Sequence, residues 1–204
     1  MAVASQNSDL HGHGEAIRKE LGKRIPRDRR LKALDVGTGF GINVAFLVAH
    51  LGGGEVWTVD PSEEVLAKVR ESLGGKAAKV GFLNASAHDM KFEDGHFDVV
   101  STVMVLHHME DLQPALEEMV RVLRPGGSLL IVDYAPVASK ELDFSTRHDA
   151  EDFSAPKDVV AGLKRLGVAA EVLDNRVWYL VEAKKPSARR PRARATSSRA
   201  RRGR

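Results

Sequence analysis

The segment that decides the fold reads Leu34-Asp35-Val36-Gly37-Thr38-Gly39-Phe40-Gly41. It lies between an apolar run that predicts a strand at Lys32–Asp35 and a helix-period stretch at Ile42–Leu51. Glycines in such a turn let the backbone reverse tightly and approach a ligand that any Cβ would block, beside the positive end of a helix. We interpret the segment as a ligand-binding loop, and the structural alternative is a glycine-rich connection without a ligand.

Strand and helix patterns alternate along the rest of the chain, which is typical of a parallel sheet covered by helices on both faces. Further strands are expected at Val56–Asp60, Lys79–Asn84, Phe97–Val103 and Ser128–Asp133. Helices are expected at Glu15–Ile25, Ser62–Leu73, Gln113–Leu123 and Lys157–Leu166. Glycines that follow the helices at Gly52, Gly74 and Gly126 supply the left-handed residue with which many helices end.

The last two strands are expected at Val168–Leu173 and Val177–Ala183, joined by the polar turn Asp174-Asn175. Two strands joined by two residues must run antiparallel. From the residues alone, an otherwise parallel sheet is therefore expected to close with one reversed edge strand.

Composition limits the classes of protein. The 204 residues include no cysteine and 31 Lys and Arg against 28 Asp and Glu, and this length suits one domain. The missing cysteine excludes disulfides, thiolate metal sites, iron–sulfur clusters and cytosine C5 methylation through a thiolate. No stretch approaches the roughly 18 apolar residues of a membrane span, and the start lacks the pattern of a signal peptide, so we expect a cytoplasmic protein.

Charge is distributed unevenly along the chain. Residues 184–204 hold ten Lys and Arg and no acid, which leaves 21 bases against 28 acids in residues 1–183. We expect a flexible N-terminus at 1–14, one domain at 15–183 and a disordered basic tail at 184–204. The tail is either an arm for non-specific contact with nucleic acid or a solvated extension.

No metal site is expected, because His11-Gly12-His13 needs further ligands.

A second candidate site residue is Asp60, which ends the second predicted strand 19 residues after Gly41. An acid there is placed to accept hydrogen bonds from ribose hydroxyls, which together with the glycine loop indicates an adenosine-containing ligand. The alternative is that Asp60 only leads into the helix that follows Ser62.

Three features favour S-adenosylmethionine over a nicotinamide dinucleotide. The glycines are spaced G-x-G-x-G rather than G-x-G-x-x-G. Asp35 lies two residues before the first glycine, where a carboxylate repels a pyrophosphate but tolerates an ammonium or sulfonium group. The closing antiparallel strand also replaces the second mononucleotide-binding half of a dinucleotide fold.

Five segments in order give the chain a family resemblance. They are Asp35–Gly41, Asp60-Pro61, His88–Val100, Val105–His108 and Leu123–Ser128. With these motifs the chain resembles class I S-adenosylmethionine-dependent methyltransferases of the small type 11 group. The resemblance implies a Rossmann-like three-layer α/β sandwich whose seven-stranded, mostly parallel sheet has the order 3-2-1-4-5-7-6 with strand seven antiparallel.

The resemblance also implies which residues bind the cofactor, S-adenosyl-L-methionine. Asp35 and the loop would hold its methionine end, Asp60 its ribose, and Pro61 would pack on adenine. Ser86 stands where many relatives carry Asp in Gly-Asp-Ala and would accept a hydrogen bond from the adenine amino group. The full expected set is Asp35, Gly37, Thr38, Gly39, Gly41, Asp60, Pro61, Ser86, Ala87 and Thr102.

Methyl transfer from a sulfonium is an in-line displacement that depends mainly on positioning. If a base is needed, His107 and His108 at the end of the fourth strand are the first candidates, and we select His107. Asp133 and Tyr134 are second candidates. The alternatives are that both histidines are framework residues, that Asp133 caps a loop, and that Tyr134 belongs to the core.

The segment 134–155 is interpreted as a substrate cover. Its five acids against two bases favour a neutral or cationic acceptor, as would a solvated loop. The sequence thus predicts a methyltransferase acting on a small molecule. The alternatives are an RNA or protein methyltransferase recruited through the tail, a non-catalytic cofactor-binding regulatory module, and a nicotinamide oxidoreductase.

Overall fold

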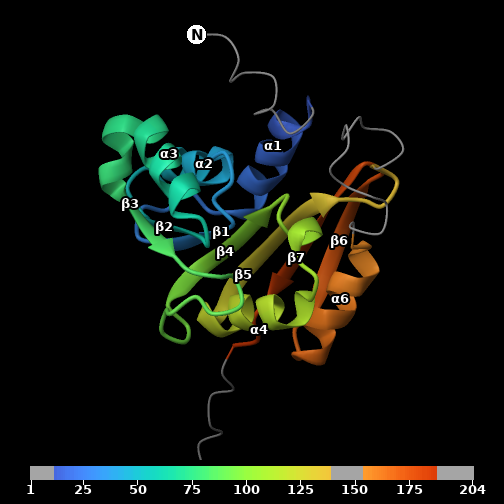
Figure 1. Ribbon diagram of the computed structural model, residues 1–204. Coiled ribbons are helices and arrows are strands. Elements are labelled where there is room, and N and C mark those ends of the chain that lie inside the picture. Colours follow the sequence, from blue (N-terminus) through green and yellow to red (C-terminus); the bar gives the residue numbers. More distant parts are fainter. Residues whose placement is uncertain (1–11, 139–153, 188–204) are drawn as a thin grey trace, which may run out of the picture.

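A seven-stranded sheet organises the protein in a computed structural model that describes residues 12–138 and 154–187 (Figure 1). The strands lie in the order β3-β2-β1-β4-β5-β7-β6. Their bounds are Lys32–Val36 (β1), Glu55–Asp60 (β2), Val80–Asn84 (β3), Phe97–Val103 (β4), Leu123–Tyr134 (β5), Ala170–Asn175 (β6) and Trp178–Lys184 (β7). The helices are Gly14–Arg24 (α1), Ile42–Leu51 (α2), Glu63–Leu73 (α3), Leu112–Val122 (α4) and Pro156–Arg165 (α6), with 3₁₀ helices at Gly74–Lys79 (η2) and Leu106–His108 (η3).

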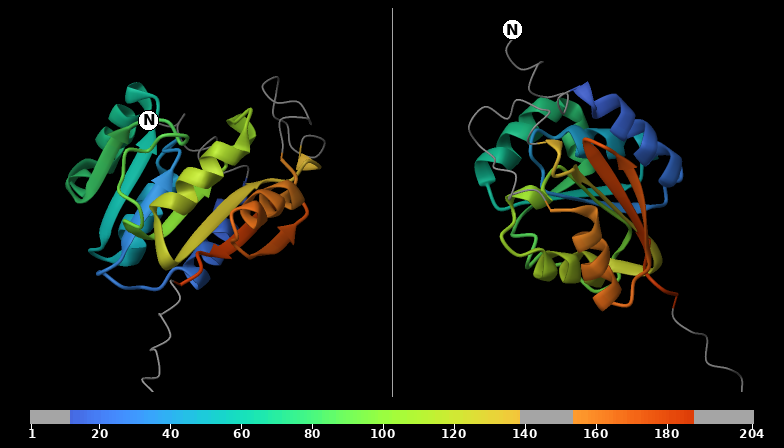
Figure 2. Two further views of the ribbon diagram at one scale, coloured as in Figure 1. Left: turned by 90° about the horizontal axis from the view of Figure 1, so that it is seen from below. Right: turned by 90° about the vertical axis from the view of Figure 1, so that its right-hand side faces the viewer.

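The helices cover both faces of the sheet, which makes three layers (Figure 2). On one face α4 and α6 pack through Leu116, Met119 and Leu163 in a buried apolar cluster. On the other face α1 and α2 pack through Leu21 and Leu47 in a second cluster. Because successive strand residues point to opposite faces, neighbours along β5 divide between the clusters, with Leu129 and Ile131 in the first and Leu130 and Val132 in the second.

The sheet order expected from the family resemblance is confirmed. Strands β1 to β5 pair in parallel, whereas β7 pairs antiparallel with both β5 and β6. The reversed strand is therefore second from the edge and β6 forms the edge, so the expectation of a reversed edge strand is wrong. Its position follows from the long pairing with β5, which runs from Ser128 opposite Lys184 to Tyr134 opposite Trp178.

The junction of α4 and β5 differs from the sequence prediction. Helix α4 ends at Val122, and Leu123 is already extended and pairs with Phe97 of β4. The left-handed Gly126, φ 78°, therefore does not end the helix but lies where the β4–β5 register shifts. In contrast, α2 ends as expected at Gly52, with φ 64°.

The turn between β6 and β7 has the expected length of two residues but lies two residues later. It consists of Arg176 and Val177, and Asn175 pairs with Trp178. Asp174 stabilises this turn, because its Oδ1 accepts a hydrogen bond from the backbone N–H of Arg176 at 2.9 Å. The polar pair in the sequence thus ends the strand and supports the turn rather than forming it.

The two ends of the sheet carry different features. The parallel strands β1 to β4 end at the edge where the glycine loop and η3 begin. Because β7 is reversed, its last residue, Lys184, lies beside Ser128 of β5, toward the opposite end of the parallel strands. Of the expected substrate cover, residues 139–153 lie outside the described residues, as do 1–11 and most of the tail. Across the described ranges, no helix has the length and apolar character needed to cross a membrane.

Candidate functional site

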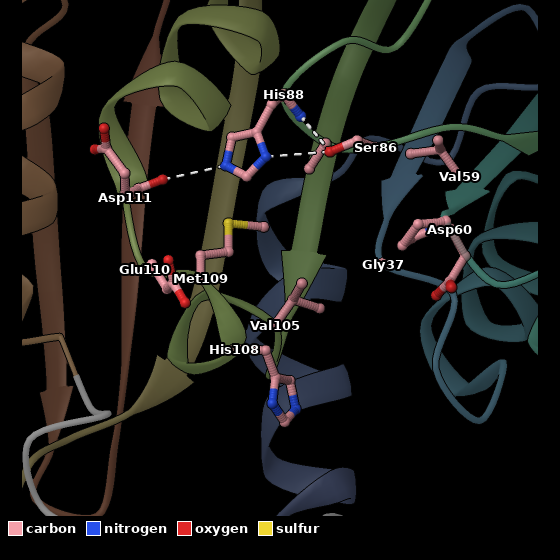
Figure 3. A pocket seen from close by; sticks show the side chains of 12 residues that line it. Gly37, Val59, Asp60, Ser86, His88, Val105, His108, Met109, Glu110 and Asp111 are labelled. Atoms are coloured by element: carbon pink, nitrogen blue, oxygen red, sulfur yellow. Dashed lines mark hydrogen bonds between the residues drawn. The ribbon is translucent and has the colours of Figure 1, made fainter.

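A cavity of about 600 Å³ opens at the carboxyl ends of β1 to β4 (Figure 3). Five of the ten expected cofactor residues line it: Gly37, Asp60, Pro61, Ser86 and Ala87. Its other lining residues are Val59, His88, Val105, His108, Met109, Glu110 and Asp111. In open α/β sheets this edge is where ligands bind.

Asp60 lies at the end of β2 and ties three backbone N–H groups to its carboxylate. Its Oδ2 accepts from Thr38 at 3.1 Å and from Gly39 at 3.4 Å, and its Oδ1 accepts from Ser62 at 2.9 Å. The residue thus fixes both the glycine loop and the entry to α3. A carboxylate has about four acceptor positions, so it can also accept from a ligand hydroxyl.

The glycine loop is shaped by packing as well as by backbone conformation. Gly37 has φ 84°, and a Cβ built there would lie 2.4 Å from a methyl group of Val105. Gly41 has φ 78°, and its Cβ would lie 2.7 Å from Val69 of α3. Gly39 also has a positive φ but faces open space. At Gly37 and Gly41 the close neighbour is therefore protein, although the sequence argument assigned that place to a ligand.

Asp35 is fully buried beneath the loop and does not line the cavity. Its carboxylate accepts hydrogen bonds from the Asn43 amide at 2.6 Å and the Thr58 hydroxyl at 2.9 Å. Burial raises the pKa of Asp35 to about 7, against the lowering effect of these two hydrogen bonds and with a smaller rise from the charge of Asp60. Its link to the site runs through Thr58, whose hydroxyl lies 2.7 Å from that of Thr38.

The remaining expected cofactor residues also lie outside the cavity lining. Thr38 is almost fully buried, and its side chain belongs to the network of Thr58 and Asp35. Thr102 is fully buried within β4, and its hydroxyl has no hydrogen-bond partner in the part of the chain that the structure describes. Of the expected cofactor residues, those inside strands (Asp35 and Thr102) and three of the glycine loop (Thr38, Gly39 and Gly41) therefore lie outside the cavity lining.

His107 forms a buried pair with Asp133. Its Nδ1 lies 2.7 Å from Oδ1 of Asp133, while the other carboxylate oxygen accepts from the backbone N–H groups of Leu106 at 2.6 Å and His107 at 3.3 Å. Asp133 therefore both holds the imidazole and caps η3. Neighbouring His108 is exposed and lines the cavity, with its ring centroid 4.1 Å from that of His107.

Tyr134 packs beside this pair, with its ring centroid 5.6 Å from that of His107. Burial, and secondarily the charge of Asp133, raises the pKa of the Tyr134 phenol well above its ordinary value. The phenol is therefore protonated at neutral pH, which argues against its use as a base.

Sequence reasoning did not assign a role to His88, Met109, Glu110 or Asp111, which line the wall formed after β3 and β4. Their position directly after two strands that end at the site is the signal that could have found them. Within the described residues, no group of three or more His, Asp or Glu side chains could hold a metal ion.

The fold and the cavity together define a Rossmann-like α/β protein with its ligand site at the carboxyl ends of the central strands. The chain belongs more specifically to the class I S-adenosylmethionine-dependent methyltransferases: residues 34–131 match the type 11 methyltransferase family, described as a methyltransferase domain. This confirms the family resemblance, and the cofactor of this family is S-adenosyl-L-methionine.

Several curated proteins are similar in sequence. The O-methyltransferase rstn1 of Aspergillus nomiae is 38% identical over 123 residues, which cover 58% of this chain and 53% of the relative. The ubiquinone/menaquinone biosynthesis C-methyltransferase UbiE of Laribacter hongkongensis is 35% identical over 108 residues, covering 52% and 44%. The chain thus spans about half the length of the curated relatives that it matches.

Solved structures share the fold at low sequence identity. A SAM-dependent methyltransferase from Aquifex aeolicus superposes with a TM-score of 0.70 at 22% identity, covering 82% of this chain and 88% of that one. The [4+2]-cyclase SpnF superposes with a TM-score of 0.71 at 16% identity, covering 91% and 86%. The second example illustrates that this fold alone does not determine the reaction.

Proposed function

We propose that this chain binds S-adenosyl-L-methionine in the cavity and transfers its methyl group to a small-molecule acceptor. The observation that carries the proposal is the cavity itself, which Asp60 of β2 lines together with Ser86 and His88 at the carboxyl ends of the strands. The named relatives include both an O-methyltransferase and a C-methyltransferase, so the proposal specifies a small nucleophile and not its acceptor atom.

The residues present fit this cofactor. A cavity of about 600 Å³ lies within the range of small-molecule sites, about 300–1,000 Å³. Asp60 offers acceptor oxygens for the ribose hydroxyls, and Pro61 offers an apolar surface for adenine. The bound cofactor supplies the methyl group and a thioether leaving group, and the chain supplies alignment.

The loop geometry also weighs against the nicotinamide alternative. A dinucleotide loop directs backbone N–H groups at a pyrophosphate. Here the N–H of Gly37 donates to the carbonyl of Val59 at 2.9 Å and that of Gly41 to the carbonyl of Thr38 at 2.8 Å. Those of Thr38 and Gly39 donate to Asp60. Donors used in this way are not available to an anionic ligand, which supports a ligand without a phosphate at the loop.

For an acceptor that must lose a proton, we assign the base to His107. Asp133 accepts from the backbone N–H groups of three residues and can accept only, so Nδ1 of His107 carries a proton toward it. The lone pair of the neutral imidazole is then on Nε2, and we assign the proton transfer to this atom. This is the orienting role that a buried aspartate has toward a histidine in other enzymes.

The direct test of function is a transfer assay with radiolabelled S-adenosylmethionine and fractionated cell extract. We expect S-adenosylhomocysteine to form and label to appear in the small-molecule fraction. Label in RNA or protein instead would favour the alternative of a recruited macromolecule. Cofactor binding without any S-adenosylhomocysteine would identify the chain as a non-catalytic module.

The assignment of the base is tested with His107→Gln, measured on the acceptor found above. We expect kcat to fall by about 10²- to 10⁴-fold while the affinity for S-adenosylhomocysteine stays within about twofold, because the variant leaves Asp60, Pro61 and Ser86 of the proposed cofactor site unchanged. The matched variant His108→Gln changes the exposed neighbour. A large loss of kcat in that variant and none in His107→Gln would transfer the assignment to His108.

The position of the last strand bears on the RNA alternative. Lys184, the last residue of β7, pairs with Ser128 of β5, so β7 ends at the side of the sheet opposite the cavity. An acceptor recruited by the tail would have to be brought from that side of the sheet to the cavity. We therefore prefer the small-molecule acceptor and retain the tail as a site of non-specific nucleic-acid contact.

A further inference from the structure

A hydrogen-bonded bridge crosses one wall of the cavity (Figure 3). His88 Nδ1 lies 3.1 Å from the Ser86 hydroxyl, and His88 Nε2 lies 3.2 Å from the backbone carbonyl oxygen of Asp111. The backbone N–H of His88 also donates to the Ser86 hydroxyl at 3.2 Å. The bridge joins the loop after β3 to the residue that precedes α4, and all three residues line the cavity.

The donor and acceptor capacity of each group determines which atoms of this bridge carry the protons. A carbonyl oxygen only accepts hydrogen bonds, so the proton of the neutral imidazole is on Nε2. Nδ1 is then an acceptor, and the Ser86 hydroxyl must donate to it. The same oxygen already accepts from the backbone N–H of His88. A hydroxyl has one proton and two lone pairs, so one lone pair remains for a ligand and no proton does.

We propose that His88 is a positioning residue that makes Ser86 a hydrogen-bond acceptor only, so that the cavity selects a nucleobase with an amino group over one with an oxo group. The inference rests on the proposed cofactor site. An adenine 6-amino group donates to the remaining lone pair of Ser86. The 6-oxo group of a hypoxanthine base presents its own lone pair to the same oxygen and is rejected.

This mechanism explains how a serine can do the work of an aspartate at this position. A carboxylate is an acceptor in any orientation, whereas a free serine hydroxyl rotates and accepts or donates equally well. The bridge through His88 removes that freedom. The selectivity of a carboxylate is thereby obtained from a neutral group, and it depends on a second residue.

The test compares two ligands by calorimetry: S-adenosyl-L-homocysteine and S-inosyl-L-homocysteine, which differ at the 6-position of the base. Wild-type protein is expected to prefer the adenosyl compound by about ten- to a hundredfold. His88→Phe keeps an aromatic ring but removes both ring nitrogens, and we expect the preference to fall to about threefold or less. Ser86→Ala is expected to reduce it similarly.

The double variant Ser86→Ala/His88→Phe tests whether His88 acts by positioning Ser86, by contacting the ligand itself, or only by supporting the structure. If His88 acts through Ser86, the ratio of the two affinities in the double variant equals that in Ser86→Ala. His96→Phe is the matched control, because His96 pairs with Glu55 outside the cavity, and its ratio should equal that of wild type.

Two results would overturn the inference. One is that His88→Phe keeps the wild-type preference for the adenosyl compound. The other is that His88→Phe lowers this preference as much in the Ser86→Ala background as it does in wild type. Failure of the proposed function is a different result, namely no binding of S-adenosylhomocysteine to well-folded wild-type protein.

Discussion

Asp35 is a buried carboxyl group in the hydrogen-bond network that lies beneath the glycine loop. Asn43 of α2 and Thr58 of β2 donate to it, and Thr58 connects it to Thr38 of the loop. The group therefore contributes to the shape of the site without contact with the cavity. Its protonation state couples the stability of this region to pH.

We predict that Asp35 makes the protein less stable as pH rises. Burial raises its pKa from 3.8 in the unfolded chain to about 7, so the folded state binds a proton that the unfolded state releases between these values. Across that window the free energy of unfolding should fall by up to about 1.4 kcal/mol per pH unit, and this contribution should level off above the folded pKa.

Urea unfolding of wild type and Asp35→Asn from about pH 5 to about pH 8 measures this contribution. The asparagine keeps an acceptor for Asn43 but does not ionise. The difference in stability between the two proteins should therefore change with pH up to about 7 and stay constant above it. Parallel curves throughout would contradict the assignment.

The sequence motif identified the residue types of the site but not all of their positions. Gly37 follows β1 and Asp60 ends β2, and both line the cavity. Asp35 lies two residues before Gly37, inside β1, and its carboxylate is hydrogen-bonded to Asn43 and Thr58 from two other elements. The spacing of residues within one short motif cannot predict such contacts, because they join elements that are distant in sequence.

At the scale of elements, the glycine loop and the segment after β4 are packed directly together. A Cβ at Gly37 would lie 2.4 Å from Val105, which itself lines the cavity. We predict that Gly37→Ala displaces Val105 and weakens the binding of S-adenosylhomocysteine at least about tenfold, in addition to a backbone strain of about 1–2 kcal/mol at φ 84°.

The double variant Gly37→Ala/Val105→Ala should recover part of the affinity in calorimetry, because it removes the clash and leaves only the strain. Gly39→Ala is the matched control. Its φ is also positive but its Cβ meets open space, so Val105→Ala should not improve it. Equal effects of Val105→Ala in both backgrounds would show that the clash is not the cause.

Lys185 stabilises the end of α4. Its Nζ donates to the backbone carbonyl oxygens of Val120 and Leu123 at 2.7 Å and of Arg121 at 3.2 Å. We predict that Lys185→Met lowers the free energy of unfolding by about 1–3 kcal/mol in urea titration. Lys184→Met is the control, since that side chain is exposed, and an equal loss in both variants would refute the cap.

Element type followed from the sequence more reliably than element ends. The helix at Ile42–Leu51 and the strand at Phe97–Val103 have the predicted bounds. The end of α4 differs because Leu123 gains burial and strand pairing, which outweigh a glycine that stands three residues later. The assignment of Lys185 to the tail likewise overlooked its contacts with α4, which belong to the folded structure alone.

At the scale of the whole molecule, local patterns gave the alternation of strands and helices but not the sheet order. The order of the strands came from the family resemblance, because the pairing of β5 with β7 joins residues about 50 positions apart. The same order brings the ends of β1 to β4 to one edge, where the cavity lies, and the end of β7 to the other.

The account depends most on the identity of the ligand, and calorimetric titration of wild-type protein with S-adenosylhomocysteine tests it most directly. We expect one molecule to bind per chain, with affinity reduced at least about tenfold in Asp60→Ala and unchanged in Asp89→Ala, whose carboxylate lies outside the cavity. NAD should give no heat and should not compete. Competition by NAD, or equal binding by wild type and Asp60→Ala, would contradict the proposed site.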